Sequence, residues 1–178
     1  MEQIVILGRG GQGAVTSSQV LAVAAFEDGK HSQAFPNFGV ERMGAPVKSY
    51  CRIDEKPINL REQVYEADYA IILDQTLAEC FDEKVKDNGL IIVNSNKSSK
   101  QIPINSKAKI VCVDITKIAI EIIGKPFVNI IALGAFAALT KKVSLSALEK
   151  AVQKQMGSKG TIAEKNVLAL KKVFEASK

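Results

Sequence analysis

The sequence predicts an α/β fold, in which a mostly parallel, Rossmann-like sheet carries helices on both faces. Three observations lead to this prediction. Several short runs are apolar and rich in β-branched residues, as strands are in a sheet that is covered on both sides. Segments with helical spacing alternate with these runs. The first run leads through a glycine-rich loop straight into a helical segment, as in nucleotide-binding folds.

The 178 residues are expected to form a single domain, residues 1–178, and the composition is that of an ordinary soluble globular protein. No signal peptide is expected, because Met1 leads directly into the first strand. The longest apolar run, residues 128–139, is too short to span a membrane. Three cysteines, Cys51, Cys80 and Cys112, lack paired spacing, which argues against disulfides, clusters and zinc. Each is expected to be a small buried hydrophobe in a cytoplasmic protein.

The net charge of +5 is concentrated in the last part of the chain. From residue 141 onward there are nine lysines and three glutamates. These lysines fall on amphipathic segments, and aromatic residues do not alternate with them. We therefore expect a solvated helix face, and neither a nucleic-acid nor a membrane partner.

Residues 3–7 are predicted to form the first strand, and residues 14–22 the start of the first helix. Between them, Gly8, Gly10 and Gly13 have the spacing G-x-G-x-x-G. A strand, a glycine loop and a helix in this order direct backbone N–H groups and a helix N-terminus at an anion. The sequence thus favours a phosphate-binding loop, and the alternative is a tight turn that binds nothing.

A standard nicotinamide site is not expected, because it needs an acidic residue about 20 residues after the loop. Residues 31–35, a short predicted second strand, contain no acid. Glu27 and Asp28 come too early, where Gly29 ends the first helix. His31, the only histidine, has no serine or cysteine placed to act with it, and we take it as structural.

Residues 35–47 contain two prolines and two glycines and are predicted to be an irregular loop. Loops of this length are often functional. Arg42 could present its guanidinium to a phosphate or carboxylate, or it could pair with the adjacent Glu41. In the following strand, residues 47–53, polar side chains alternate with small or apolar ones. This pattern predicts a half-exposed strand, at an edge or under a partner.

Three further strands are expected at residues 70–73, 90–93 and 109–113, with a turn at 87–89. Asp74, Asn94 and Asp114 follow these strands, at the edge where parallel sheets bind ligands. Asp114 could instead cap the helix that follows it, residues 115–123.

Three helices are predicted in the last third of the chain. Residues 128–139 are apolar on all sides and rich in small residues, which indicates a buried helix opened by Asn129. Residues 144–155 and 161–176 are amphipathic.

Two stretches together carry a family resemblance. They are Gly8-x-Gly10-Gly11-Gln12-Gly13 and Phe35-Pro36-x-Phe38-Gly39-Val40-Glu41-Arg42-x-Gly44-Ala45-Pro46-Val47. In this order they resemble the gamma subunits of pyruvate:ferredoxin oxidoreductase, and more widely the gamma domain of 2-oxoacid:acceptor oxidoreductases. The resemblance runs over nearly the whole chain, including Asn129, Leu133-Gly134-Ala135 and Asn166. Met43 stands where the family usually has a second arginine.

The resemblance implies a role in the oxidative decarboxylation of pyruvate or a related 2-oxoacid to an acyl-coenzyme A, with electrons passing to ferredoxin. The chain lacks a thiamine diphosphate motif and cluster cysteines. Thiamine diphosphate and the iron–sulfur clusters are therefore expected on sibling alpha, beta and delta subunits, and the isolated chain is expected to be inactive. What remains for this subunit is assembly and part of the coenzyme A site.

The resemblance and the loop pattern together assign no catalytic or metal-binding residue. They give seven candidate residues for binding a phosphate of coenzyme A: Gly8, Arg9, Gly10, Gly11, Gln12, Gly13 and Arg42. Two alternatives stay open, a purely structural subunit without a ligand and a free-standing Rossmann protein that binds NAD(P).

Overall fold

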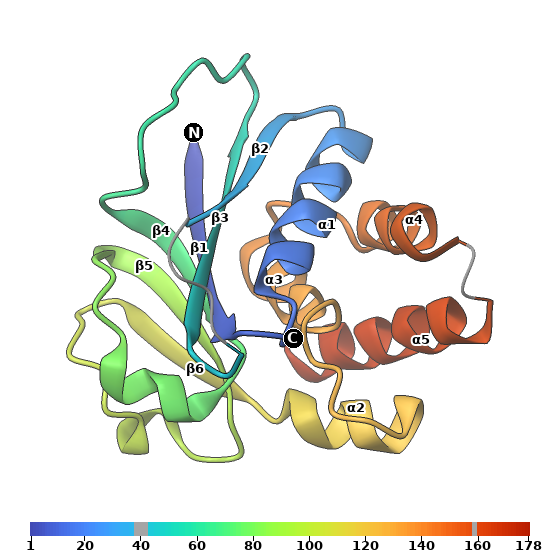
Figure 1. Ribbon diagram of the computed structural model, residues 1–178. Coiled ribbons are helices and arrows are strands. Elements are labelled where there is room, and N and C mark those ends of the chain that lie inside the picture. Colours follow the sequence, from blue (N-terminus) through green and yellow to red (C-terminus); the bar gives the residue numbers. More distant parts are fainter. Residues whose placement is uncertain (38–42, 158–159) are drawn as a thin grey trace.

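A single six-stranded sheet forms the centre of the computed structural model, which describes residues 1–37, 43–157 and 160–178 (Figure 1). The strand order is β2-β3-β1-β4-β5-β6. β1, β4, β5 and β6 run parallel, whereas β3 is antiparallel to both β1 and β2. The strands are β1 (Glu2–Arg9), β2 (His31–Pro36), β3 (Pro46–Asp54), β4 (Ala67–Ile72), β5 (Val85–Asn94) and β6 (Lys109–Val113).

The α-helices gather on one side of the sheet, and two short 3-10 helices lie on the other (Figure 1). The α-helices are α1 (Ala14–Glu27), α2 (Ile115–Ile123), α3 (Ala132–Thr140), α4 (Leu145–Met156) and α5 (Thr161–Ala176). The 3-10 helices are η1 (Gln75–Cys80) and η2 (Ser99–Gln101). The predicted fold class, a mostly parallel α/β sheet with helices on both faces, is confirmed, although the helical cover of the second face is short.

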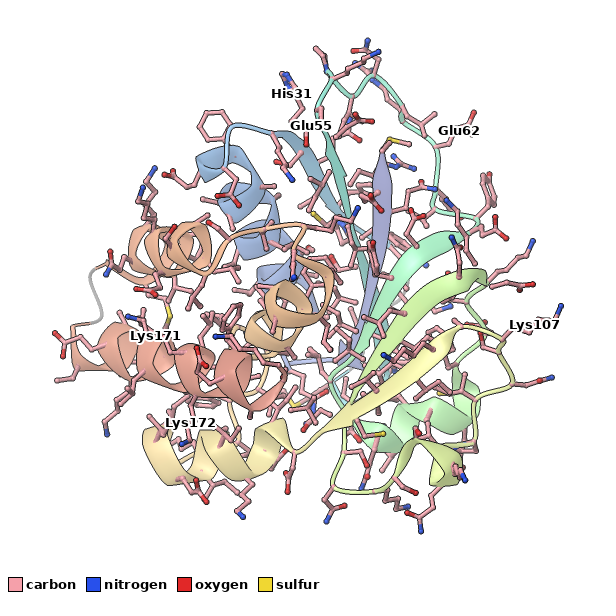
Figure 2. All side chains as sticks on the ribbon, turned by 180° about the vertical axis from the view of Figure 1, so that it is seen from behind. His31, Glu55, Glu62, Lys107, Lys171 and Lys172 are labelled. Atoms are coloured by element: carbon pink, nitrogen blue, oxygen red, sulfur yellow. The ribbon has the colours of Figure 1, made fainter. Side chains whose placement is uncertain are left out.

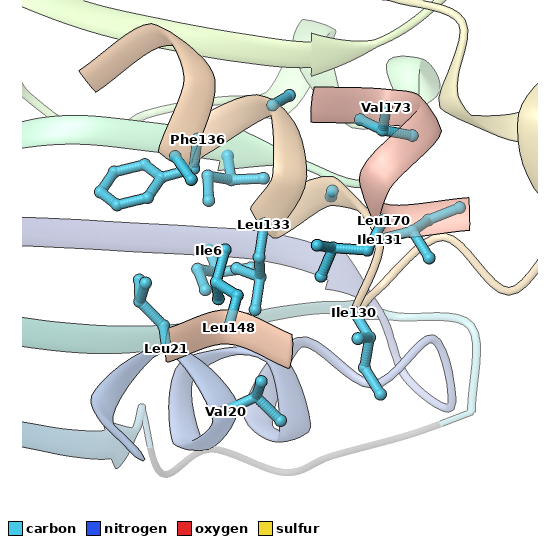
Figure 3. Packing of buried hydrophobic residues seen from close by; sticks show 14 of the residues in the cluster. Ile6, Val20, Leu21, Ile130, Ile131, Leu133, Phe136, Leu148, Leu170 and Val173 are labelled. Atoms are coloured by element: carbon cyan, nitrogen blue, oxygen red, sulfur yellow. The ribbon is translucent and has the colours of Figure 1, made fainter. Parts of the chain in front are cut away.

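The core is divided by the sheet into two clusters, because successive strand residues point to opposite faces. In β1, Ile4 and Ile6 belong to the cluster under the α-helices, whereas Val5 and Leu7 belong to the cluster on the face of η1. Figure 3 shows Ile6 among side chains of α3, α4 and α5. The predicted burial of the apolar helix is confirmed, since residues 132–137 of α3 are all buried.

Two predicted elements differ from the structure. The helix expected from residue 128 begins only at Ala132, so Asn129 lies in the preceding turn and does not open the helix. Residues 87–89, predicted to be a turn, lie inside β5, where the pairing with β4 shifts register. A glycine and polar residues mark irregular backbone, but a bulge accommodates them without ending the strand.

The prediction that β3 is half-exposed is wrong. β3 is paired on both sides, and its polar-face residues Tyr50 and Arg52 are 3% and 1% exposed. The cover comes from the same chain, because the carbonyl groups of Leu60, Glu62 and Gln63 accept hydrogen bonds from Arg52.

The single-residue expectations for the surface have mixed outcomes. Cys51 is buried and Cys112 is half-buried, but Cys80 is exposed, so not every cysteine is a core residue. His31, the first residue of β2, is exposed, and its side chain extends outward from the molecule (Figure 2). Lys171 and Lys172 are exposed on α5, in agreement with a solvated basic face (Figure 2). In the described parts of the chain, no helix is both long and apolar enough to cross a membrane.

Candidate functional site

A cavity of about 420 Å³ lies at the carboxyl ends of β1, β4 and β5. One wall is the glycine loop, with Gly11 and Gln12, and the floor includes Asn94 at the end of β5. The opposite wall is the segment 126–128, which connects α2 to α3. The volume of this cavity lies in the range of about 300–1,000 Å³ that is usual for small-molecule sites.

The glycine loop requires glycine at two positions. Gly11 and Gly13 have φ values of 90° and 84°, a left-handed conformation that side chains rarely adopt. A Cβ atom on Gly13 would also lie 2.4 Å from Nδ2 of Asn129. Gln12 closes the turn, since its N–H donates to the carbonyl of Arg9 and its Oε1 accepts from the N–H of Arg9.

The start of α1 can accept an anion. Gly13 precedes the helix, no side chain caps it, and its first turn holds no acidic residue. Among the described residues, the N–H groups of Gly13 and Ala14 have no backbone acceptor. Unpaired N–H groups and the positive end of the helix dipole both favour a phosphate at this position.

Arg9, predicted to supply charge to a phosphate, is already engaged in the structure. Its Nε donates to Oδ2 of Asp74 at 3.0 Å, Nη1 to the carbonyl of Gly44 at 3.0 Å, and Nη2 to Oγ1 of Thr76 at 2.6 Å. A guanidinium has five N–H groups, and the described residues accept from three of those of Arg9. Arg9 therefore joins the glycine loop to two other loops.

Asp74, which follows β4, is held as a carboxylate. Its Oδ1 accepts from the N–H and the hydroxyl of Thr76, at 2.9 and 2.6 Å. Burial alone would raise the pKa of Asp74, but the hydrogen bonds from Thr76 and Arg9 outweigh it and lower that pKa below its usual value. The negative charge beside the glycine loop is thus balanced by Arg9.

Asn94 fixes the floor of the cavity. Its Nδ2 donates to the carbonyl of Leu73 and to Oγ1 of Thr116, and its Oδ1 accepts from the N–H of Thr116. Asp114, the third polar residue predicted at this edge, instead caps α2 by accepting from the N–H of Lys117. The sequence thus identified Asp74 and Asn94 correctly as cavity residues, and the alternative interpretation of Asp114 is the right one.

Of the remaining predicted residues, Gly8 and Gly10 are described by the structure and Arg42 is not. Gly8 packs against Leu73, since a Cβ on Gly8 would lie 3.1 Å from Cδ1 of Leu73. Gly10 pairs with the second glycine stretch, because its N–H donates to the carbonyl of Ala45 and its carbonyl accepts from Gly44. Arg42 lies outside the described residues, and the neighbouring Met43 is 96% exposed.

The sequence reasoning missed one wall of this cavity. Thr116, Pro126 and Phe127 line it, and Phe127 is 47% exposed. A proline followed by an aromatic residue between two helices was the available signal, but only the fold brings that segment opposite the glycine loop.

A larger cavity of about 510 Å³ lies beside β2 and β3, on the face away from α1. Its buried cation, Arg52, donates all its N–H groups within the chain, to Gln3, Gln33 and three carbonyl groups of residues 60–63. The donors of this buried cation are therefore not available to a ligand, and the cavity lies away from the glycine loop. The smaller cavity, at the glycine loop and the strand ends, is the better candidate. In the described chain, no group of three or more His, Cys, Asp or Glu side chains is placed to hold a metal ion.

Comparisons with known proteins give matches over nearly the whole length of this chain. A family model described as pyruvate ferredoxin/flavodoxin oxidoreductase matches residues 3–176. The pyruvate synthase subunit PorC of Methanosarcina barkeri is 52% identical, covering 86% of this chain and 85% of its own length. The pyruvate/ketoisovalerate oxidoreductases common subunit gamma of Thermococcus kodakarensis is 44% identical, with 98% and 96% covered.

Solved structures give the same result. The pyruvate oxidoreductase subunit PORC of Thermotoga maritima superposes with a TM-score of 0.86 at 34% identity, covering 98% of this chain and 95% of that one. The 2-oxoglutarate:ferredoxin oxidoreductase of Magnetococcus marinus, with 2-oxoglutarate, coenzyme A and succinyl-CoA bound, matches with a TM-score of 0.82. This match covers 99% of this chain but 31% of that one, and at 19% identity it shows the fold alone.

Proposed function

This chain belongs to the pyruvate ferredoxin/flavodoxin oxidoreductase family, and from this premise we propose that its glycine loop binds a phosphate of coenzyme A. It is a gamma subunit of a pyruvate or related 2-oxoacid:ferredoxin oxidoreductase, a multi-subunit enzyme. In the proposal, the 2-oxoacid is converted to an acyl-coenzyme A and the electrons pass to ferredoxin. The partners are the sibling alpha, beta and delta subunits, which hold thiamine diphosphate and the iron–sulfur clusters.

The observation that carries the proposal is the unpaired start of α1 beside the cavity. The N–H groups at Gly13 and Ala14 and the positive end of the helix meet at the glycine loop, where Gly11 leaves the backbone open to a ligand. A helix N-terminus contributes about 0.3–1 kcal/mol toward an exposed anion. Each charge-assisted hydrogen bond adds roughly 1.5–3 kcal/mol. The two N–H groups of Arg9 that no described residue accepts, and the guanidinium of Arg42, would supply such bonds.

Two alternatives remain distinct from this proposal. A purely structural subunit would use the glycine loop only as a turn, and coenzyme A would then bind without it. A free-standing NAD(P) protein has no acid at the spacing that a ribose requires. Titration of the full chain with NADH and with coenzyme A separates the proposal from these two alternatives. Saturable binding of NADH would favour the free-standing NAD(P) protein.

The decisive experiment replaces Gly11 by aspartate in the assembled enzyme. The carboxylate would lie against the phosphate, and a φ of 90° is unfavourable for aspartate. We expect the coenzyme A concentration for half-maximal rate to rise at least about tenfold, which corresponds to about 1.4 kcal/mol. Gly29→Asp is the matched control, because Gly29 has a similar φ of 78° and open space around it, but lies after the far end of α1.

The coenzyme A-independent decarboxylation of pyruvate should be unchanged in Gly11→Asp, since it needs no phosphate at this loop. Arg42→Ala is expected to raise the coenzyme A requirement by about tenfold as well. If Gly11→Asp and Gly29→Asp assemble alike and both show the normal coenzyme A requirement, the loop is a turn and the proposal is wrong.

A further inference from the structure

Phe127 is an aromatic residue that the packing of the protein covers only in part. It is 47% exposed at the mouth of the cavity, opposite Gly11 and Gln12. Leaving an aromatic surface in water is unfavourable, so covering the exposed part of the ring is favourable. Phe127 therefore gains from any flat apolar group that enters the cavity.

The backbone holds Phe127 in place. The N–H of Phe127 donates to the carbonyl of Lys125 at 2.8 Å, a three-residue turn whose central residue is Pro126. On the other side, Val128 is 3% exposed, and the carbonyl of Asn129 accepts from Oγ of Ser17 at 2.9 Å. The ring is exposed although the chain on both sides of it is fixed, which is the arrangement of a binding platform.

A cation accompanies the ring. Nζ of Lys125 lies 5.8 Å from the centre of the Phe127 ring. No carboxylate of the described residues forms an ion pair with Lys125. The segment 125–127 thus places a positive charge next to the aromatic face that lines the cavity, while the glycine loop offers N–H groups to an anion.

A ligand that satisfies both walls carries a flat ring together with phosphate groups, which is the chemistry of a nucleotide. We propose that Phe127 stacks on the adenine ring of coenzyme A while the glycine loop holds its diphosphate, and that Lys125 faces the phosphate on the ribose. This proposal rests on the proposed function of the glycine loop and adds the residue that recognises the adenine end.

The experiment uses the assembled enzyme and two competitors of coenzyme A, each representing one end of the molecule. Adenosine 3′,5′-bisphosphate contains the ring, and 4′-phosphopantetheine does not. Phe127→Ala should weaken inhibition by the bisphosphate about tenfold, in the range of measured base–aromatic stacking, and leave that by 4′-phosphopantetheine unchanged. Phe127→Tyr should retain the inhibition. Lys125→Gln should weaken inhibition by the bisphosphate and leave inhibition by 4′-phosphopantetheine unchanged. The difference in inhibition between this variant and the original protein should shrink as salt is added.

Phe26→Ala is the matched control, because Phe26 is 71% exposed near the end of α1 and lies away from the cavity. If Phe127 instead packs against a sibling subunit, Phe127→Ala will impair assembly while Phe127→Leu restores both assembly and inhibition by the bisphosphate, and the stacking proposal is overturned. The stacking proposal is also overturned if Phe127→Ala weakens inhibition by both competitors equally, or changes inhibition by neither. An unchanged coenzyme A requirement in Gly11→Asp refutes the loop proposal separately.

Discussion

The guanidinium of Arg9 and the carboxylate of Asp74 form an ion pair of 3.0 Å that joins the end of β1 to the end of β4. Both side chains are partly buried, with 38% and 22% of their surface exposed. The pair lies where two parallel strands end side by side, so it fixes the distance between the glycine loop and η1. It also neutralises Asp74, the only carboxylate among the described residues that line the cavity.

Replacing Asp74 by asparagine is expected to lower the free energy of unfolding of the full chain by about 1 kcal/mol at pH 7. The pKa of Asp74 in the folded protein is below its usual value. A lowered folded-state pKa stabilises the protein above the unfolded pKa of about 3.9, and this stabilisation is lost as the pH falls through the folded-state value. The difference between the two proteins in urea unfolding should therefore be present at pH 7 and shrink progressively as the pH falls below about 4.

Gly13→Ala is expected to destabilise the chain by at least about 2 kcal/mol, from the left-handed backbone and the contact with Asn129. In Asn129→Ala the amide group that a Cβ would meet at 2.4 Å is gone. The double variant should therefore regain the steric part, which a double-mutant cycle by urea unfolding measures. Gly124→Ala, with a φ of 83° and open space, reports the backbone part alone. Additive losses would contradict this account.

The sequence predicted the elements whose signal is local. The bounds of β6, α2 and α5 agree with the predicted ranges, because apolar periodicity and the cap at Asp114 define them. The exposure of β3 was not predictable in this way. Lys48 on its polar face pairs with Asp82 and Glu83, residues more than thirty positions along the chain. An alternating strand is buried or exposed according to such distant partners, which periodicity does not contain.

The candidate site was predicted to the extent that it depends on the glycine loop and the strand ends. The glycine spacing indicated where the backbone would be open, and the residues after β4 and β5 indicated the floor. The wall with Phe127 was missed because it follows α2 and meets the loop only through the packing of α3 against the sheet. The predicted role of Arg9 was incomplete because it did not include its partners Asp74 and Thr76, which lie more than sixty residues away in the sequence.

The three cysteines should react in the order of their exposure. Burial raises the pKa of the Cys51 thiol strongly, and also that of Cys112, so neither forms the reactive thiolate at neutral pH. Cys80 is exposed and should be alkylated first. Treatment of the native full chain with iodoacetamide at pH 8, followed by mass spectrometry of peptides, measures the order. Modification of Cys51 before Cys80 would contradict the buried position of β3.

The buried cation Arg52 holds the segment 60–63 against the sheet, and its loss should release that segment. All five of its N–H groups are donated within the chain, and the guanidinium stacks 4.8 Å from the centre of the Phe35 ring. Arg52→Met leaves the carbonyl groups of the segment without a donor. We expect a loss of at least about 3 kcal/mol in the free energy of unfolding, and faster proteolysis within residues 58–63.

Arg52→Lys should be nearly as harmful, because a compact ammonium cannot replace the planar set of donors that reaches Gln3, Gln33 and the segment at once. Arg61→Met is the control, since Arg61 is exposed on the same segment and should change stability by less than about 0.5 kcal/mol. Urea unfolding and limited proteolysis of the full chain measure both effects. Equal stabilities of Arg52→Met and Arg61→Met would show that the segment is held by its apolar contacts, such as that of Val64 with the core, and not by the arginine.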